Sequence, residues 1–350
     1  MQLRHLHGYG PWIFEVINAG FVSAAPNGEI WSRQFPLFVP EWDEVRFSLA
    51  WDGQDCDVLF VYDVLPKPLP AVKAAYRVFV ASEPGTIKRY LPGFLSQFDL
   101  VLTTDTGTRH PNVRLSQVGL PWHVGVWEKP GQLKSRGIGW CEFETFRPVK
   151  TKQVSIVSSD KAYTQGHRER LAFVERIKTF FGDEIDVFGR GVNDFTDKMD
   201  VLSDYRYHIA IENSTFDHYW TEKLADPFLT LTYPIYHGSR NILEYFPEEA
   251  LTRINILDHE NAIRAIKHVI ESDTAERALP YLEESRRRVL NEHNLFAILS
   301  RIAKEVAGPR SGLAPAKISS LKPEKSFRTK GLKLRNSIRK RLQQLAGLFR

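Results

Sequence analysis

Residues 205–239 read YRYHIAIENSTFDHYWTEKLADPFLTLTYPIYHGS. The first seven letters form an apolar, strand-like run, and a helix-like run begins near Thr221. A second strand-like run starts at Tyr233. The loop between the first strand and the helix collects polar side chains: Glu212, Asn213, Ser214, Tyr219, Glu222 and Lys223. The succession of strand, polar loop, helix and strand predicts an α/β domain.

The same alternation continues on both sides of this stretch. Helical spacing of apolar residues predicts a helix over 166–182, and Asp258 is placed to cap another helix over 259–272. We therefore predict a C-terminal α/β domain over residues 151–308. Its further strand-like runs are residues 153–159, 185–191 and 253–258.

The N-terminal half has its own strands. Three continuous apolar runs, each ending in a polar loop, occupy residues 57–66, 76–85 and 98–107. Such runs are typical of a parallel sheet covered on both faces, whose ligands gather at the carboxyl ends of the strands. Glu83 lies at such an end. We predict an N-terminal α/β domain over residues 1–150, which ends in a polar interdomain linker over 128–152.

The composition is that of a globular protein large enough for two domains. Of the 350 residues, 43% are hydrophobic and 12% aromatic, which is enough for real cores. Cys56 and Cys141 lie far apart without metal-ligand spacing, so neither a disulfide framework nor a cysteine metal site is expected. The first residues lack the apolar core of a secretory signal, and no apolar run approaches the about 18 residues of a membrane span. These features predict a cytoplasmic location.

The charge is unevenly distributed along the chain. The formal net charge is +5, but residues 309–350 contain twelve basic residues and one acidic residue, which gives +11. The rest of the chain is therefore mildly acidic, at −6. An acidic body without a recognisable nucleic-acid motif argues against a nucleic-acid-binding protein.

The basic segment also carries an amphipathic pattern. Leucine and isoleucine recur among lysine and arginine at roughly helical spacing over 326–350, after a proline- and serine-containing connector. Such a tail fits an anionic membrane surface, here the inner face of a membrane. The alternative is a solvated tail, or one that binds RNA only through its charge.

The loop and helix start in the opening stretch predict an anion site. The first turn of a helix has free backbone N–H groups, and its dipole favours negative charge. Lys223 adds a positive charge there, and the Glu222 carboxylate could accept both hydroxyl hydrogens of a ribose. Together these features indicate a nucleotide with phosphates. The alternative is that both residues are ordinary helix-surface charges beside a turn.

The opening stretch resembles the signature region of glycosyltransferase family 10, the α-1,3/1,4-fucosyltransferases. The resemblance is clearest over 153–258, and the matching residues are Glu212, Asn213, Ser214, Tyr219, Thr221, Glu222, Lys223, Pro234, Tyr236 and Gly238. It implies an α/β, GT-B-like fold: two Rossmann-like domains facing a cleft, here followed by the basic tail over 309–350. It also implies inverting transfer of L-fucose from GDP-fucose to a glycan hydroxyl, with no cofactor and no essential metal.

The resemblance also implies roles for residues. An inverting transferase needs a general base in the cleft, and Glu83 is the candidate, with Asp63 and Asp105 at similar strand ends as rivals. Lys223 and Arg170 would stabilise the diphosphate, with Arg168 as the alternative to Arg170. For the rest of the donor, Glu222 would hold the ribose, and Asn213 and Tyr219 would line the pocket.

Other functions stay open at this point. The chain could use a different nucleotide sugar, or it could be a non-catalytic nucleotide-sugar-binding protein. The joint presence of Arg170, Asn213, Tyr219, Glu222 and Lys223 speaks against a decayed site. The tail suggests an acceptor such as lipopolysaccharide or another cell-surface glycan.

Overall fold

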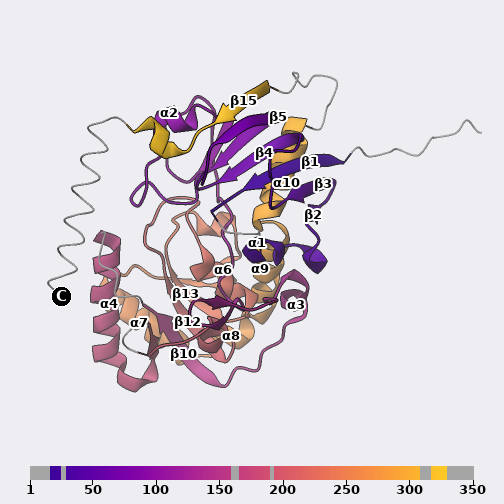
Figure 1. Cartoon of the computed structure of the whole chain (residues 1–350). Coiled ribbons are helices and arrows are strands. Elements are labelled where there is room, and N and C mark those ends of the chain that lie inside the picture. The colour runs from indigo at the N-terminus through magenta and orange to yellow at the C-terminus, as the bar shows by residue number, and fades with distance from the viewer. Residues whose placement is uncertain (1–15, 25–28, 159–164, 190–192, 308–316, 329–350) are drawn as a thin grey trace, which may run out of the picture.

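The computed structural model describes residues 16–24, 29–158, 165–189, 193–307 and 317–328. They form two lobes, each built around its own sheet, with the N-terminal lobe above the C-terminal lobe in Figure 1. The predicted α/β class with two Rossmann-like halves is confirmed. Within these ranges no helix is both long and apolar enough to cross a bilayer.

The N-terminal sheet is largely parallel. Its strands follow the order β2-β3-β1-β4-β5-β6-β7, and only β2 runs antiparallel to its neighbour in that series. Continuous apolar runs form its central strands because both faces of the sheet are covered by the two hydrophobic clusters of this lobe. The bounds are β1 Ile17–Val22, β2 Glu41–Trp42, β3 Val45–Ser48, β4 Cys56–Tyr62, β5 Leu69–Val80, β6 Leu100–Thr103 and β7 Val113–Leu115.

The C-terminal sheet is parallel throughout, in the order β11-β10-β12-β13-β14. Its strands are β10 Lys152–Val157, β11 Asp186–Phe188, β12 Tyr205–Ile211, β13 Tyr233–His237 and β14 Thr252–Arg253. The strand predicted over 253–258 is therefore only two residues long, and it begins one residue earlier. In its place the chain turns at Asn255–Asp258, and Asp258 caps the next helix as predicted.

Helices connect and cover the strands of the C-terminal lobe. The predicted helix over 166–182 is confirmed as α4, and Gly182 ends it with a φ of +55°. The helices of this half are α3 Trp140–Thr145, α4 Gln165–Phe181, α5 Met199–Leu202, α6 Glu222–Leu229, α7 His259–Ile270, α8 Thr274–Arg277 and α9 Leu279–Asn291.

The chain returns to the N-terminal lobe after α9. Helix α10 (Leu295–Ala307) buries Phe296, Leu299 and Ile302 against the N-terminal sheet. The predicted C-terminal domain over 151–308 therefore ends too late. The reason is that the apolar face of α10 fits the aromatic cluster of the other lobe, where Phe296 stacks on Phe35 at 4.1 Å between ring centroids.

Part of the segment predicted as a tail is also folded. Strand β15 (Lys317–Leu321) pairs antiparallel with the first half of β5, and the short helix η7 (Glu324–Phe327) follows it (Figure 1). This contradicts the prediction of a single tail over 309–350. The first half of β5 extends beyond β6 and leaves an edge that β15 can pair with, and Leu321 is buried there. Residues 329–350, on which the amphipathic pattern falls, lie outside the described residues.

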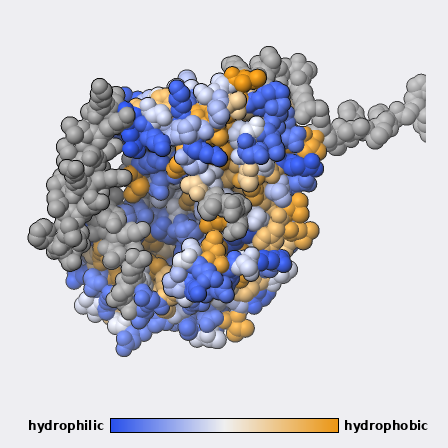
Figure 2. All heavy atoms as spheres, in the orientation of Figure 1, coloured by the Kyte–Doolittle hydropathy of each residue, from blue (hydrophilic) through white to orange (hydrophobic). Residues whose placement is uncertain are grey.

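The linker between the lobes is itself folded, and a side chain of the N-terminal lobe binds to it. It contains the hairpin of β8 (Trp127–Lys129) and β9 (Gln132–Leu133) followed by α3. Arg33 of the N-terminal lobe is buried and donates to the carbonyl groups of Trp122, Val124 and Ile138. Figure 2 shows polar residues around the hollow between the lobes on this face of the molecule.

Candidate active site

The site is built where β12 ends and α6 begins. Thr221 is the N-cap of α6, and its hydroxyl oxygen accepts the backbone N–H of Lys223 at 3.3 Å. The Glu212 carboxylate accepts the backbone N–H of Thr221 at 2.7 Å. The prediction that the helix start offers free N–H groups is therefore wrong for these two groups, because side chains of the chain already occupy them. The positive charge of the site comes chiefly from side chains.

Glu212 is a buried carboxylate that contacts both Thr221 and Lys223. Its side chain is inaccessible to solvent, and Oε2 lies 2.8 Å from the Thr221 hydroxyl and 3.6 Å from Lys223 Nζ. Burial raises the pKa of Glu212, and Lys223 opposes that shift. We predicted no role for Glu212 beyond its match to the family. The ENS-to-TEK spacing is nevertheless the signal that the loop folds back onto this residue.

Lys223 lies between two carboxylates. Its Nζ is 3.1 Å from Glu222 Oε1 and 3.2 Å from the Thr221 hydroxyl, in addition to the contact with Glu212. Burial alone would lower the pKa of Lys223, but Glu222 and Glu212 outweigh it and raise the pKa. Lys223 is therefore a fixed cation at neutral pH.

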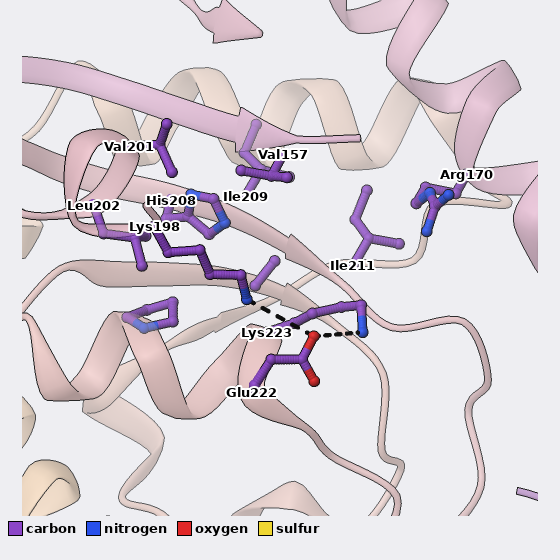
Figure 3. Close-up of a pocket in the computed structure, with 12 residues that line it drawn as sticks. Val157, Arg170, Lys198, Val201, Leu202, His208, Ile209, Ile211, Glu222 and Lys223 are labelled. Carbon is purple, nitrogen blue, oxygen red and sulfur yellow. Dashed lines mark hydrogen bonds and ion pairs between the residues drawn. The ribbon is translucent and has the colours of Figure 1, made fainter. Parts of the chain in front are cut away.

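Glu222 makes all of its contacts through one oxygen. Oε1 lies 3.1 Å from Lys223 Nζ, 3.7 Å from Lys198 Nζ and 3.9 Å from His123 Nδ1. Burial works against ionisation, but Lys223 and Lys198 hold the pKa of Glu222 well below its usual range. In Figure 3 the second oxygen points away from both lysines, so the carboxylate keeps one oxygen for a ligand.

A cavity of about 130 Å³ adjoins these residues (Figure 3). Arg170 reaches it from the second turn of α4, is buried, and donates to Asn213 Oδ1 at 2.7 Å. Arg168 is exposed, so the structure favours Arg170 as the arginine of the pocket. Burial lowers the pKa of Arg170, but an arginine stays charged.

Tyr219 is buried beside the same charges. Burial raises its pKa, as do the nearby carboxylates of Glu212 and Glu222, whereas Lys223 opposes them. The hydroxyl is therefore neutral and available as a donor. Five of the six predicted site residues, from Arg170 to Lys223, thus come together in the C-terminal lobe.

The sixth, Glu83, comes from the N-terminal lobe. It is half-buried on the loop after β5, and burial and Asp63 raise its pKa. The charges of Lys223 and Glu222 in the other lobe also act on this pKa: Lys223 lowers it and Glu222 raises it. The lobes touch at this point, where the Thr86 and Ser214 hydroxyls lie 2.8 Å apart.

The two rival carboxylates are engaged elsewhere. Asp63 Oδ1 accepts the Tyr90 hydroxyl and lies 3.2 Å from Lys88 Nζ. Asp105 Oδ1 accepts the backbone N–H of Gly107 at 2.9 Å. Glu83 has neither restraint among the described residues.

Sequence reasoning missed two aspartates that bind residues 123–127, the segment just before the linker, to the C-terminal lobe. Asp226 in α6 is fully buried, accepts the backbone N–H of His123 at 3.1 Å and pairs with Lys198 at 2.9 Å. Asp197 accepts the backbone N–H groups of Gly125, Val126, Trp127 and Met199 at 2.6–2.8 Å. The acidic residue inside the apolar run LADPFL was the available signal for Asp226.

His208 lies in the core of the C-terminal lobe. His208 is buried in β12, where its Nδ1 meets the Ser155 hydroxyl at 2.8 Å, and burial lowers its pKa to about 3. His208 is therefore a packed residue of the core. Trp122 is also a core residue, against Phe143. In the part of the chain that the structure describes, no group of three or more histidine, cysteine, aspartate or glutamate side chains could hold a metal ion.

The C-terminal half of the chain is similar in sequence to known fucosyltransferases. The family model described as "Glycosyltransferase family 10 (fucosyltransferase) C-term" matches residues 147–283. Alpha-(1,3)-fucosyltransferase C of Drosophila melanogaster is 25% identical over 229 residues, which are 60% of this chain and 51% of that protein. Alpha-(1,3)-fucosyltransferase FucT of Helicobacter pylori is 32% identical over 72 residues, 21% of this chain and 15% of that one. The chain thus spans about half or less of these relatives.

The fold comparison covers more of the chain. A crystal structure of an alpha1,3-fucosyltransferase aligns with a TM-score of 0.50 at 16% identity, over 90% of this chain and 95% of that one. At that identity the likeness establishes the fold, a GT-B-like pair of Rossmann-like lobes facing a cleft. Residues 147–283, which contain the predicted cluster from Arg170 to Lys223, are the part of the chain that matches the C-terminal model of glycosyltransferase family 10, the fucosyltransferase family.

Proposed function

We propose that this chain transfers L-fucose from GDP-fucose to a hydroxyl group of a glycan, with inversion at the sugar carbon. One observation carries the proposal: the loop that bears Glu83 meets the loop before α6, where the Thr86 and Ser214 hydroxyls lie 2.8 Å apart, so Glu83 and the Lys223 and Glu222 pair come from two lobes that touch here. A direct displacement requires a base beside the attacking hydroxyl and, on the other side of the sugar carbon, a cation that stabilises the departing diphosphate. The family match supports GDP-fucose as the donor.

Glu83 would act as the general base. As the acceptor oxygen bonds to the anomeric carbon, Glu83 takes the proton of that hydroxyl, and the bond from the carbon to the phosphate oxygen breaks. The electron pair of that bond leaves with GDP. A raised pKa makes the ionised carboxylate of Glu83 a stronger proton acceptor.

Lys223 and Arg170 would stabilise the departing diphosphate. Both are held before the donor arrives, Lys223 by Glu212 and Arg170 by Asn213. Cations fixed in this way stabilise the charge that grows on the leaving group without reorganising first. Because these cations can neutralise the diphosphate, we propose that no metal is essential. Activity that survives EDTA would support this point.

Glu222 would hold the ribose with its second oxygen, and Asn213 and Tyr219 would line the donor site. The first oxygen of Glu222 is fixed by Lys223 and Lys198. That contact keeps the carboxylate ionised and leaves for the ribose the second oxygen, which points away from both lysines in Figure 3.

We also propose that the acceptor is a cell-surface glycan such as lipopolysaccharide, modified at the inner face of a membrane. The described chain ends at Arg328, next to η7 on the N-terminal lobe. The basic residues that follow would then bring the acceptor-binding lobe to an anionic surface. Loss of binding to anionic liposomes after deletion of 329–350 would support this, and equal binding of both chains would exclude it.

The first experiment measures melting temperature with GDP, UDP and CDP. GDP should raise it most; a larger rise with UDP or CDP would favour a different nucleotide sugar. Turnover of GDP-fucose with glycan acceptors then separates an enzyme from a binding protein. Stabilisation by GDP without any turnover, with or without acceptor, would identify a non-catalytic binding protein.

A further inference from the structure

A second cavity lies in the N-terminal lobe, beside the loop that carries Glu83. Its volume is about 260 Å³, and its lining includes Arg89, Tyr90, Leu91, Leu95, Asp105 and Arg109. This is smaller than the ~300–1,000 Å³ of pockets for drug-sized ligands. It therefore suits a single sugar ring better than a nucleotide.

The cavity lies next to the loop that carries the proposed base, Glu83. A Cβ atom added to Gly85 would lie 2.4 Å from the Asp105 carboxylate, so this part of the loop is pressed against Asp105. From Pro84 a tight turn, closed by the N–H groups of Ile87 and Lys88 on the Pro84 carbonyl, leads directly to Arg89. A group bound in the cavity would thus lie next to the loop that positions Glu83.

The walls of the cavity differ in chemistry. Leu91 and Leu95 give it an apolar side, with Leu95 fully buried. The lining also includes two guanidinium groups, those of Arg89 and Arg109. Arg109 is exposed and makes no hydrogen bond or ion pair with any described residue, and Arg89 is 76% exposed, with its Nε 4.0 Å from Asp105 Oδ2.

Two guanidinium groups beside an apolar wall suit a particular ligand. Arginine binds carboxylate, phosphate or sulfate groups through two parallel hydrogen bonds. The apolar wall suits the C–H face of a sugar, and Asp105 can accept a hydroxyl hydrogen. The neighbouring Lys88 does not contribute, since it is paired with Asp63 and lies over the Tyr90 ring.

From this arrangement we infer that the cavity is an acceptor subsite for an acidic sugar, such as a uronic acid, or a sugar that carries phosphate or sulfate. The inference rests on the proposed function, because the acceptor hydroxyl must reach Glu83. It adds the chemical class of the acceptor: an anionic glycan, whose charge Arg89 and Arg109 would bind.

The test titrates three probes by NMR at one ionic strength: methyl β-D-glucuronide, methyl β-D-glucoside and inorganic phosphate. The glucuronide should bind the wild-type protein at least about fivefold more tightly than either other probe. The double variant R89Q/R109Q should lose about tenfold in glucuronide affinity and leave the weak glucoside binding unchanged. Arg46, an exposed arginine of the same lobe paired with Glu41, provides the matched control R46Q.

Three results would overturn the inference. They are equal binding of glucoside and glucuronide, phosphate binding as tight as glucuronide binding, which would indicate a bare anion site, and unchanged glucuronide affinity in the double variant. If R89Q/R109Q does not fold, R89K/R109K takes its place. That variant keeps both charges but loses the paired hydrogen bonds of the guanidinium groups, so its affinity for the glucuronide should fall by about threefold. The GDP-dependent rise in melting temperature is measured on the same samples. Its absence would contradict the proposed function, while the glucuronide titration still decides the subsite.

Discussion

Lys198 Nζ lies 2.9 Å from the Oδ2 of Asp226, and the side chain of Asp226 is completely buried. The same ammonium group is 3.7 Å from Glu222 Oε1. Lys198 therefore links a buried structural carboxylate to the carboxylate proposed to hold the donor. Neither contact could be read from the sequence, where Lys198 stands 24 positions before Glu222.

Removing the lysine should lower both stability and donor affinity. K198M leaves the Asp226 carboxylate buried without its cation, which typically costs about 3–5 kcal/mol. We expect the free energy of unfolding in urea to fall by about 3 kcal/mol, and the affinity for GDP to fall as Glu222 loses its second cation. K178M removes a lysine of α4 that pairs with Glu175 on the surface, so it should change neither quantity appreciably. Equal stability of the two variants would contradict the structural role of Lys198.

Glu83 should be needed for chemistry but not for donor binding. E83Q keeps the size of the side chain and removes the base, so kcat should fall by about 10²–10⁴-fold, while the Kd for GDP stays within about twofold. D63N tests the engaged rival at a neighbouring strand end, and its kcat should fall far less than that of E83Q. Loss of GDP binding in E83Q, or unchanged turnover, would remove Glu83 as the base.

The raised pKa of Glu83 also predicts the acid side of the activity profile. A general base must be deprotonated, so kcat/KM should fall as the pH drops through the pKa of Glu83. Because burial and Asp63 raise that pKa, the fall should begin at a higher pH than for an ordinary glutamate. D63N removes one of the causes that raise this pKa, so the fall of kcat/KM on the acid side should move to lower pH. If D63N leaves the acid side of the kcat/KM profile unchanged, the titrating group is not Glu83.

Stability should depend on pH through His208. Burial, with a contribution from Lys198, lowers the pKa of His208 to about 3, so the native state holds the ring neutral while the unfolded chain protonates it near the ordinary value of about 6.5. The stability due to the neutral ring is therefore present above pH 6.5 and is lost as the pH falls towards 3, by up to about 1.4 kcal/mol per pH unit.

H208L should reduce this slope of unfolding free energy against pH by about one proton. The Ser155 hydroxyl would keep its bond to the Val201 carbonyl in that variant, at 2.6 Å. His293, whose pKa burial lowers to about 4, contributes in the same direction and should keep part of the slope. A slope that H208L leaves unchanged would show that His208 is not buried in the neutral form.

The parts of the site that follow one another in the chain were predictable. Glu222 and Lys223 stand at the start of a helix whose cap, Thr221, precedes them, and the loop before it begins at the carboxyl end of a strand. Local sequence fixes all of these features. Arg170 was distinguishable from Arg168 because residues two positions apart on a helix point in different directions, and the structure buries the first and exposes the second.

Contacts between distant segments were not predictable. Glu212 was visible in the sequence, but that its carboxylate occupies the helix start follows only from how the loop folds back. Helix α10 was assigned to the wrong lobe because its apolar stripe reveals that it is buried, but not against which sheet. Strand β15 was read as part of a tail because it is short and surrounded by basic residues and prolines, and because its partner strand lies more than 240 positions earlier.

That strand provides a final test of the C-terminal segment. Leu321 is completely buried where β15 meets β5, so L321A should lower the free energy of unfolding by about 2–5 kcal/mol, as for other core leucines. L279A, at a leucine that is 44% exposed at the start of α9, should cost less than 1 kcal/mol. Because Glu324, three residues further on, accepts the backbone N–H of Leu91 beside the second cavity, L321A should also weaken glucuronide binding. A variant as stable as L279A would mean that residues 317–328 are the loose connector that their composition suggested.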